Sequence, residues 1–374
     1  MSSLADQVRA GLRGAACGTR AAGLMSEQPG IVDRAPAERT PLPLLPPERA
    51  VRKLLLRQLK QAEGAGQRLA VGEDPEALHD FRVALRRFRA IERAYRSCLG
   101  EALPKKLRKR LQELVRSTGP ARDSEVQLEW LRQQGAALRP NQRPGYHWLR
   151  RRIEDRQRRA YAAIRGAVPM QFVALGTLLR GALAMPAESS PRSFAAAAAE
   201  QLRPLAAELS ASFAALADDA EMTHVHAARL LIKRARYVLE PVAPALQRGK
   251  ELSHELAGLQ ELLGAMHDAE VLGLSLADAA AEAGAARYRA LVAGALGEAA
   301  GDSMPLPRQR GDERAGLTAL AQQVQAQMRS GRAALLARIR GGEVALLLQR
   351  LDQAAATLAA LQPAVAAVAA LAPR

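Results

Sequence analysis

Two stretches of this sequence, which begin at histidines 147 residues apart, carry the same spacing of basic side chains. The stretches are "HDFRVALRRFR", from His79, and "HAARLLIKRAR", from His226. Basic residues follow each histidine at +3, +7, +8 and +10: Arg82, Arg86, Arg87 and Arg89 in the first copy, and Arg229, Lys233, Arg234 and Arg236 in the second. A fold for this chain must therefore provide two comparable helices.

A second pair of matching stretches lies downstream of each copy. "GPARDSEV" (119–126) and "GAMHDAEV" (264–271) share a glycine, an aspartate four residues later and a valine seven residues later. The aspartates, Asp123 and Asp268, are 145 residues apart, close to the separation of the histidines. Two ordered matches at nearly the same offset indicate an internal duplication.

On a helical wheel of about 100° per residue, the residues at +3, +7 and +10 fall within about 80° of the histidine. The residue at +8, Arg87 in the first copy, flanks this arc at about +80°. The opposite side is apolar and predicts the buried face: Phe81, Leu85, Phe88 and Ile91 in one copy, and Ile232, Ala235, Val238 and Leu239 in the other. A single basic helix face is usually only solvated. Two such faces with few interspersed acidic residues favour the binding of an anion.

The rest of the sequence predicts an all-α fold. Apolar residues recur with helical spacing from residue 48 onward, no stretch alternates with the period of a strand, and Asp74 with Pro75 predicts a helix start. We expect a helical bundle of two pseudo-symmetric, four-helix halves around a central basic groove. The expected divisions are a flexible Pro-rich tail (1–47), a first half (48–190) and a second half (191–374) with an Ala-rich C-terminal segment.

The charge of the chain is unevenly distributed. Residues 51–165 carry 28 basic and 13 acidic side chains, whereas residues 201–374 carry 18 of each, within a net charge of +16. Codon bias alone would not sort charge in this way, so a polyanionic partner is expected. We expect a cytoplasmic protein, because there are only two cysteines, no secretory signal and no apolar run long enough for a transmembrane span.

At these motifs the sequence resembles the CHAD family, the conserved histidine α-helical domain. "HDFRVALRRFR", "HAARLLIKRARYVLE" and the turns "GPARD" and "GAMHD" carry the resemblance, which covers about residues 48–345. It implies two basic helices that face each other across a groove, and inorganic polyphosphate as ligand. It also implies an association with polyphosphate or polyhydroxyalkanoate granules, as for some family members.

The resemblance assigns the anion-binding role to the two histidines, to the eight basic residues that follow them and to Tyr237. We expect supporting roles at helix ends or beside arginines for four residues: Arg122, Asp123, Glu240 and Asp268. His267 stands where the first copy has Arg122, so one contact of the first copy has no counterpart there.

Two other classes of function are weighed against a non-catalytic polyphosphate binder. A nucleic-acid-binding protein fits the charge, but few aromatic residues are available for base stacking. A polyphosphate-processing enzyme could use the histidines, but the chain has no phosphate-binding P-loop and no acidic cluster for Mg²⁺. No catalytic residue, metal site or cofactor is expected.

Overall fold

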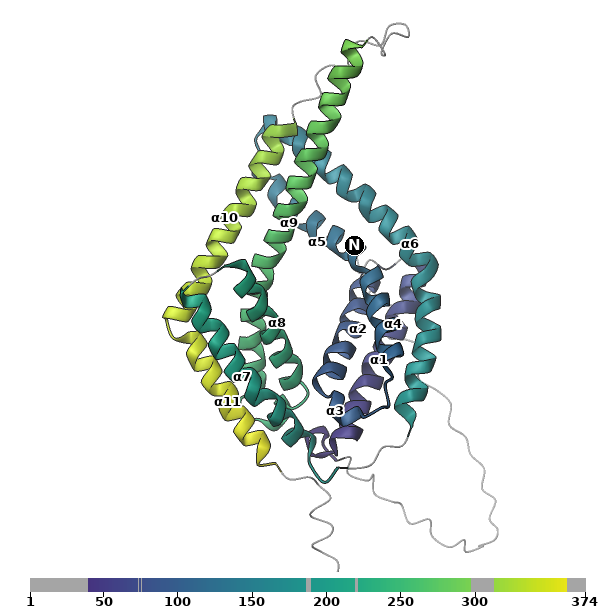
Figure 1. Ribbon diagram of the computed structural model, residues 1–374, viewed down its shortest axis with the longest axis vertical. Helices are drawn as coiled ribbons and strands as arrows, with labels where there is room; N and C mark the ends of the chain where they lie inside the picture. The colour runs from purple at the N-terminus through teal and green to yellow at the C-terminus, as the bar shows by residue number, and fades with distance from the viewer. Residues whose placement is uncertain are drawn as a thin grey trace, which may run out of the picture. The chain divides into compact units, whose positions relative to one another are not determined.

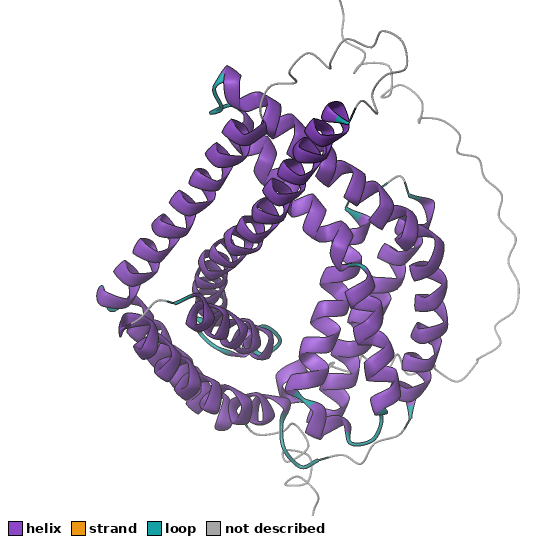
Figure 2. Cartoon of the chain, turned by 45° about the horizontal axis from the view of Figure 1, so that its top comes forward, coloured by secondary structure: helices purple, strands orange, loops and turns teal. Residues whose placement is uncertain are grey.

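The computed structural model describes residues 40–72, 74, 76–185, 190–218, 221–296 and 313–361, and every regular element in these ranges is a helix (Figures 1 and 2). The prediction of an all-α fold is confirmed. The first group of helices comprises η1 (Leu42–Leu44), α1 (Pro47–Val71), α2 (Ala77–Ala94), α3 (Arg96–Leu99), α4 (Lys105–Ser117), α5 (Gly119–Gly135), η2 (Pro140–Gln142) and α6 (Arg143–Ala184). The second comprises α7 (Phe194–Asp218), α8 (Met222–Leu239), η3 (Ala243–Ala245), α9 (Gly249–Ala295), α10 (Glu313–Arg340) and α11 (Glu343–Ala359).

The helix that carries the first basic motif, α2, begins slightly later than predicted. Its N-cap is Glu76 rather than Asp74, and Pro75 lies outside the described residues. The Asp74 carboxylate instead accepts a hydrogen bond from the Glu76 backbone N–H at 2.8 Å, which forms an Asx turn ahead of the helix. Arg68 of α1 pairs with both Asp74 and Asp80 at 2.5 Å, and so joins this turn to its neighbour helix.

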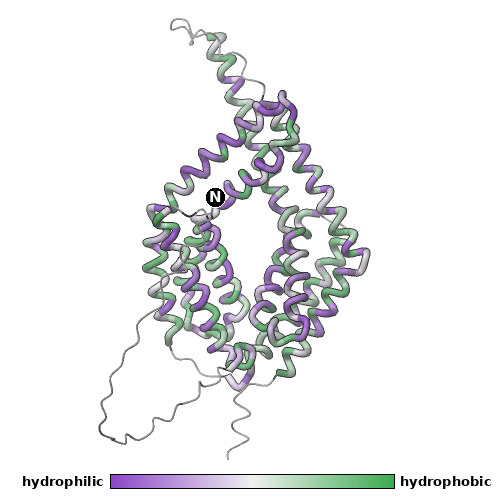
Figure 3. The backbone as a smooth tube through the Cα atoms, turned by 180° about the vertical axis from the view of Figure 1, so that it is seen from behind, coloured by the Kyte–Doolittle hydropathy of each residue, from purple (hydrophilic) through white to green (hydrophobic). Residues whose placement is uncertain are grey.

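The apolar faces predicted for the two motif helices are buried in the main core. Phe81, Leu85, Phe88 and Ile91 of α2, and Ile232, Ala235, Val238 and Leu239 of α8, are all at most 5% exposed. Hydrophilic and hydrophobic residues alternate along these helices as amphipathic packing requires (Figure 3). α2 packs on α1, and α8 packs on α7 and α9. Burial of one face fixes which side chains the other face presents.

A second core, which the sequence did not reveal, lies where α5 and α6 meet α9 and α10. Leu131 and Ile153 from the first pair of helices pack in it with Leu272 and Leu320 from the second pair. The Trp130 indole N–H donates to the Gln327 side-chain oxygen at 2.8 Å across the same helices. Both cores contain residues from either side of residue 190, so the two pseudo-symmetric halves and their boundary stay a prediction.

The long helix α9 corrects one expectation. The resemblance implied a turn at "GAMHD" (264–268), but α9 continues through it from Gly249 to Ala295. Leu263, Met266, Ala269 and Leu272 keep a helical spacing across the motif and are buried, so packing holds the helix straight through Gly264. The first-copy motif "GPARD" is the first turn of α5, one residue after α4 ends.

The segment Pro140–Ala184, which contains η2 and α6, is long and apolar enough to cross a membrane by length and composition. One such helix is weak evidence for a membrane span, because the core helices of bundles have the same composition. α6 contacts α1, α4, α5 and α10, and Val168, Phe172 and Leu179 are buried. The Phe172 ring meets Phe81 edge-on at 4.9 Å between ring centres.

Two glycines allow α6 and α10 to cross closely. A Cβ atom at Gly316 would lie 2.2 Å from the Gln142 carbonyl oxygen, and one at Gly145 would lie 2.2 Å from the Glu313 carbonyl oxygen. Both obstacles are backbone atoms, which cannot move without shifting a helix.

We predict that Gly316→Ala lowers the free energy of unfolding by about 1–3 kcal/mol, because overpacking outweighs the gain in helix propensity. Urea unfolding followed by circular dichroism measures the change. Gly181→Ala is the matched control, since nothing lies within 4 Å of its added Cβ, and it should leave stability unchanged or raise it. Equal stability of the Gly316 variant and wild type would contradict the close crossing.

Candidate anion-binding site

The basic faces of α2 and α8 meet where these helices contact each other. The Arg86 Nε–H on α2 donates to the Tyr237 hydroxyl on α8 at 3.3 Å. The Tyr95 hydroxyl, one residue beyond α2, donates to the Val238 carbonyl at 3.2 Å. These bonds place the C-terminal parts of the two helices side by side, as Figure 1 shows.

Five basic side chains gather at this contact, and we call them the α2–α8 basic cluster: Arg86, Arg89, Arg229, Lys233 and Arg236. The Lys233 ammonium is at its centre. Burial lowers the pKa of Lys233 to about 8, and the positive charges of the four arginines contribute to this shift. Burial is the larger cause of this shift from the ordinary value of 10.5, and the additional lowering by four arginines shows that positive charge surrounds the ammonium group.

Two carboxylates act on the basic cluster in the described structure: Glu240 pairs with Arg236, and the charge of Glu92 raises the pKa of Arg89 against the larger lowering by burial. Glu240 lies 3.2 Å from Arg236 Nε, which agrees with the expected position beside an arginine. The other four cations of the cluster have no ion pair with any described carboxylate. The cluster therefore holds five cations against two carboxylates, and only one of these, Glu240, forms an ion pair in it; an anionic ligand would stabilise this arrangement.

Tyr237 lies beneath the cluster. It is 4% exposed, its hydroxyl accepts the bond from Arg86, and its ring lies 5.5 Å from the Arg236 guanidinium carbon. The sequence placed Tyr237 among residues that contact the anion. In the structure it positions two arginines from the buried side, which the helical wheel alone did not indicate.

Arg82 lies next to the cluster but is partly engaged. Its Nη1 donates to the Thr118 hydroxyl at 2.5 Å and to the Val115 carbonyl at 3.2 Å, and so closes the C-terminal end of α4. Burial lowers the pKa of the Arg82 guanidinium, while Asp123 acts in the opposite direction. Arg82 is thus shared between the cluster and the packing of α4.

The residues at +8 do not join the cluster. Arg87 lines a small pocket on the α1 side of α2, with Lys60, Arg68 and Asp80. Arg234 turns toward α7, where Glu208 lies 3.7 Å from its Nη1. Both copies thus direct the +8 residue to a neighbouring helix, as its position at the edge of the arc allows.

The two motif histidines also differ in their surroundings. The His226 ring lies 5.1 Å from the His267 ring of α9, so the residue that replaces Arg122 in the second copy contacts the motif histidine. His79 lines a separate cleft of about 1180 Å³ between the start of α2 and helices α5 and α6, together with Arg122 and Asp268.

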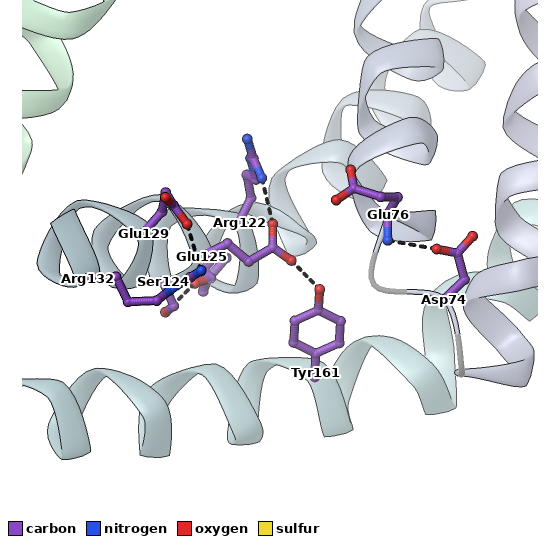
Figure 4. A network of polar contacts seen from close by, with 9 residues as sticks. Asp74, Glu76, Arg122, Ser124, Glu125, Glu129, Arg132 and Tyr161 are labelled. Carbon is purple, nitrogen blue, oxygen red and sulfur yellow. Dashed lines mark hydrogen bonds and ion pairs between the residues drawn. The ribbon is translucent and has the colours of Figure 1, made fainter.

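The arginines of this larger cleft are mostly neutralised. Arg122 pairs with Glu125 at 2.8 Å, Arg132 with Glu129 at 2.8 Å, and Arg150 with Glu154 at 2.7 Å. The Tyr161 hydroxyl donates to the Glu125 carboxylate (Figure 4). The pKa of Tyr161 is raised, mainly by burial. The cleft thus offers an anion much less unpaired positive charge than the α2–α8 basic cluster.

Three of the four predicted supporting residues, Arg122, Asp123 and Asp268, lie in or next to this cleft, whereas Glu240 lies at the basic cluster. Burial is the main cause that raises the pKa of the Asp123 carboxyl. The positive charges of Arg82 and Arg156 lower this pKa, and the negative charge of Asp268 raises it. The two motif aspartates, from α5 and α9, are therefore close to one another. Arg122 and Asp123 lie near the start of α5, whereas Asp268 is inside α9 and braces no helix end.

The structure adds two basic residues that the sequence analysis did not single out. Arg93 on α2 and Arg116 on α4 are exposed, and their charges lower the pKa of Arg89 after the larger effect of burial. Arg93 falls at about −40° on the wheel that starts at His79, so one further turn of the same analysis would have found it. No sequence pattern places Arg116 beside it, because α4 reaches α2 only through tertiary packing.

No group of three or more His, Cys, Asp or Glu side chains in the described ranges is arranged to hold a metal ion. His147 and His254, which lie outside the two basic motifs, are not among the cluster residues.

We predict that Lys233→Met stabilises the ligand-free protein at pH 7 by about 1 kcal/mol, because it removes a desolvated charge from like charges. The folded-state pKa of Lys233 lies below its ordinary value. The protonated cluster therefore destabilises the fold fully below pH 8, and wild-type stability recovers as pH rises toward 10.5. Urea unfolding at pH 7 and pH 9.5 measures both effects. A variant less stable than wild type at pH 7 would contradict the electrostatic account.

Known proteins resemble this chain over the region that contains both basic motifs. The family model described as "CHAD domain" matches residues 53–277, which is more than half of the chain. The crystal structure of the CHAD domain from the plant Ricinus communis is similar at 21% identity and a TM-score of 0.53, and the match covers 88% of this chain and 98% of that one. PptA from Streptomyces chartreusis is similar at 18% identity and a TM-score of 0.55, covering 79% of this chain and 99% of that one. No curated protein matches the sequence.

Proposed function

This chain belongs to the CHAD domain family, and on that premise we propose that it binds inorganic polyphosphate through the α2–α8 basic cluster, without catalysis. The observation that carries the proposal is the set of five cations of which only Arg236 forms an ion pair with a described carboxylate, Glu240. One guanidinium group can donate two parallel hydrogen bonds to the oxygens of one phosphate. Arginines about one helical turn apart can therefore bind successive phosphates of a chain. The same proposal places the protein in the cytoplasm, on polyphosphate or polyhydroxyalkanoate granules.

The composition of the cluster favours a phosphate chain over a nucleic acid. Its aromatic side chain, Tyr237, is buried beneath the arginines and presents no face on which a base could stack. The cluster includes no Asn or Gln that could read a base edge. A ligand that consists only of phosphates makes full use of this surface, and a nucleic acid does not.

We predict that the double variant Arg86→Gln/Arg229→Gln lowers polyphosphate affinity at least tenfold, because each change removes a cation from one wall of the cluster. These positions are preferable to Arg82, which also holds the end of α4. Calorimetric titration with long-chain polyphosphate measures the affinity. The matched control is Arg192→Gln/Arg248→Gln, which removes the same charge from arginines that Glu200 and Glu251 already pair. An equal loss of polyphosphate affinity in the two double variants would show that binding depends only on the net charge of the protein, and this would contradict the proposed site.

We also predict that affinity depends on pH through Lys233. Bound phosphates raise the pKa of Lys233 from about 8, so binding takes up a proton above that pH. Affinity should be about tenfold lower at pH 9 than at pH 7 in wild type. Lys233→Arg stays charged and should remove this dependence, since an arginine is protonated throughout the range. The same pH profile in the variant and in wild type would exclude Lys233 from the binding site.

A further inference from the structure

The α2–α8 basic cluster continues along one side of α2. Arg89 belongs to the cluster through its effect on Lys233, and it also lies close to Arg93, one turn further along α2, and to Arg116 on α4. From Arg86 to Arg93 the helix rises about 10 Å. Arg89 thus connects the cluster to a second group of cations, which we call the α2–α4 rim: Arg89, Arg93 and Arg116.

The rim cations are only partly compensated, because the charge of Glu92 acts on Arg89 against the charges of Arg93 and Arg116. Arg93 and Arg116 are exposed, and no described carboxylate forms an ion pair with any of the three rim residues. The nearby Glu92 is turned to other partners: it accepts from Arg96 Nε at 2.9 Å and from Arg108 Nη1 at 3.3 Å. Glu92 thus bonds to Arg96 and Arg108 while its charge also reaches Arg89, and Arg93 and Arg116 keep the rim positive on balance.

The other end of α2 differs in charge. Asp123 and Glu125 of α5 lie beyond Arg82. The negative charge of Asp268 raises the pKa of Asp123. Arg122 is held by Glu125 at 2.8 Å. A polyanion that leaves the cluster in that direction meets Asp123 and Glu125 among the arginines, whereas one that passes Arg89 meets two exposed arginines, Arg93 and Arg116, and the largely buried Glu92.

The two repeats are unequal at the corresponding position. Arg93 lies 14 residues after His79, and 14 residues after His226 the second copy has Glu240. Glu240 pairs with Arg236 and closes the row of cations on α8. The α2 wall alone therefore continues outward.

We propose that the α2–α4 rim is an outer subsite for the phosphates of a long polyphosphate chain whose inner part occupies the cluster. This inference rests on the proposed function and adds chain-length selectivity to it. A chain of three phosphates can fill the cluster without touching Arg93 or Arg116, while a long chain engages both. The ligand class of the rim is thus a linear polyphosphate that extends beyond the cluster.

The test compares Arg93→Gln/Arg116→Gln with wild type, using long-chain polyphosphate and tripolyphosphate as probes. We expect the double variant to bind the long chain about tenfold more weakly at low salt and to bind tripolyphosphate as wild type does. The slope of log affinity against log salt for the long chain should become shallower by about 1.4, because each of the two arginines accounts for about 0.7 of that slope. Both residues are exposed, so thermal unfolding should show an unchanged fold.

The control is again Arg192→Gln/Arg248→Gln, which should match wild type for both probes. Equal weakening for the two probes, or no weakening for either, would overturn the outer subsite while wild-type binding still supports the cluster. If wild type binds neither probe, the proposed function itself fails, so the two ideas are separated by one data set.

Discussion

The structure depends on a conflict between like charges and apolar packing at the contact of α2 and α8. Phe81, Leu85 and Phe88 on one helix, and Ile232 and Ala235 on the other, are buried in the core and fix the rotation of both helices. That rotation turns most of the residues at +3, +7 and +10 of the two motifs toward the space between the helices. Burial of about ten apolar side chains, at roughly 1.5–3 kcal/mol each, exceeds the repulsion that the partly desolvated cations generate. The fold thus holds the cations together in the absence of a ligand.

Like charges held together in this way lower the stability of the fold, which points to a function for the cations. A ligand-free cluster with a depressed lysine pKa is a local cost to stability, as functional sites often are. The surrounding contacts limit the motion of these side chains. Arg86 donates a hydrogen bond to Tyr237, and Arg236 forms an ion pair with Glu240. The neighbouring Arg82 donates a hydrogen bond to Thr118. An anion therefore meets cations that are already positioned, which reduces the ordering that binding requires.

Much of this could be predicted from the sequence because helices obey a simple geometry. The all-α class, the buried stripes of α2 and α8, the divergence of Arg87 from the arc and the position of Glu240 beside an arginine all follow from about 100° per residue and the repeat. Contacts between elements could not be predicted in this way. The buried position of Tyr237, the bond from Arg82 to Thr118, the second core of α5, α6, α9 and α10, and the rim residue Arg116 depend on tertiary packing.

The misplaced turn at 264–268 has the same cause. Glycine and a histidine–aspartate pair resemble a helix end in isolation, and the first copy does place its motif at one, in α5. In α9 the flanking leucines and Met266 are buried in the two cores, and this packing outweighs the weak local preference of Gly264. The two matching motifs thus keep the spacing of Asp123 and Asp268 while the local structure around them differs.

The central claim is that the α2–α8 basic cluster selects a bare chain of phosphates rather than a nucleic acid. The most direct measurement is competition: wild-type protein with labelled long-chain polyphosphate bound is challenged with unlabelled polyphosphate, duplex DNA and RNA at equal total charge and near-physiological salt. The account predicts that unlabelled polyphosphate displaces the label and that DNA and RNA at the same charge displace little of it. Equal displacement by all three competitors would show a general polyanion surface and contradict the account.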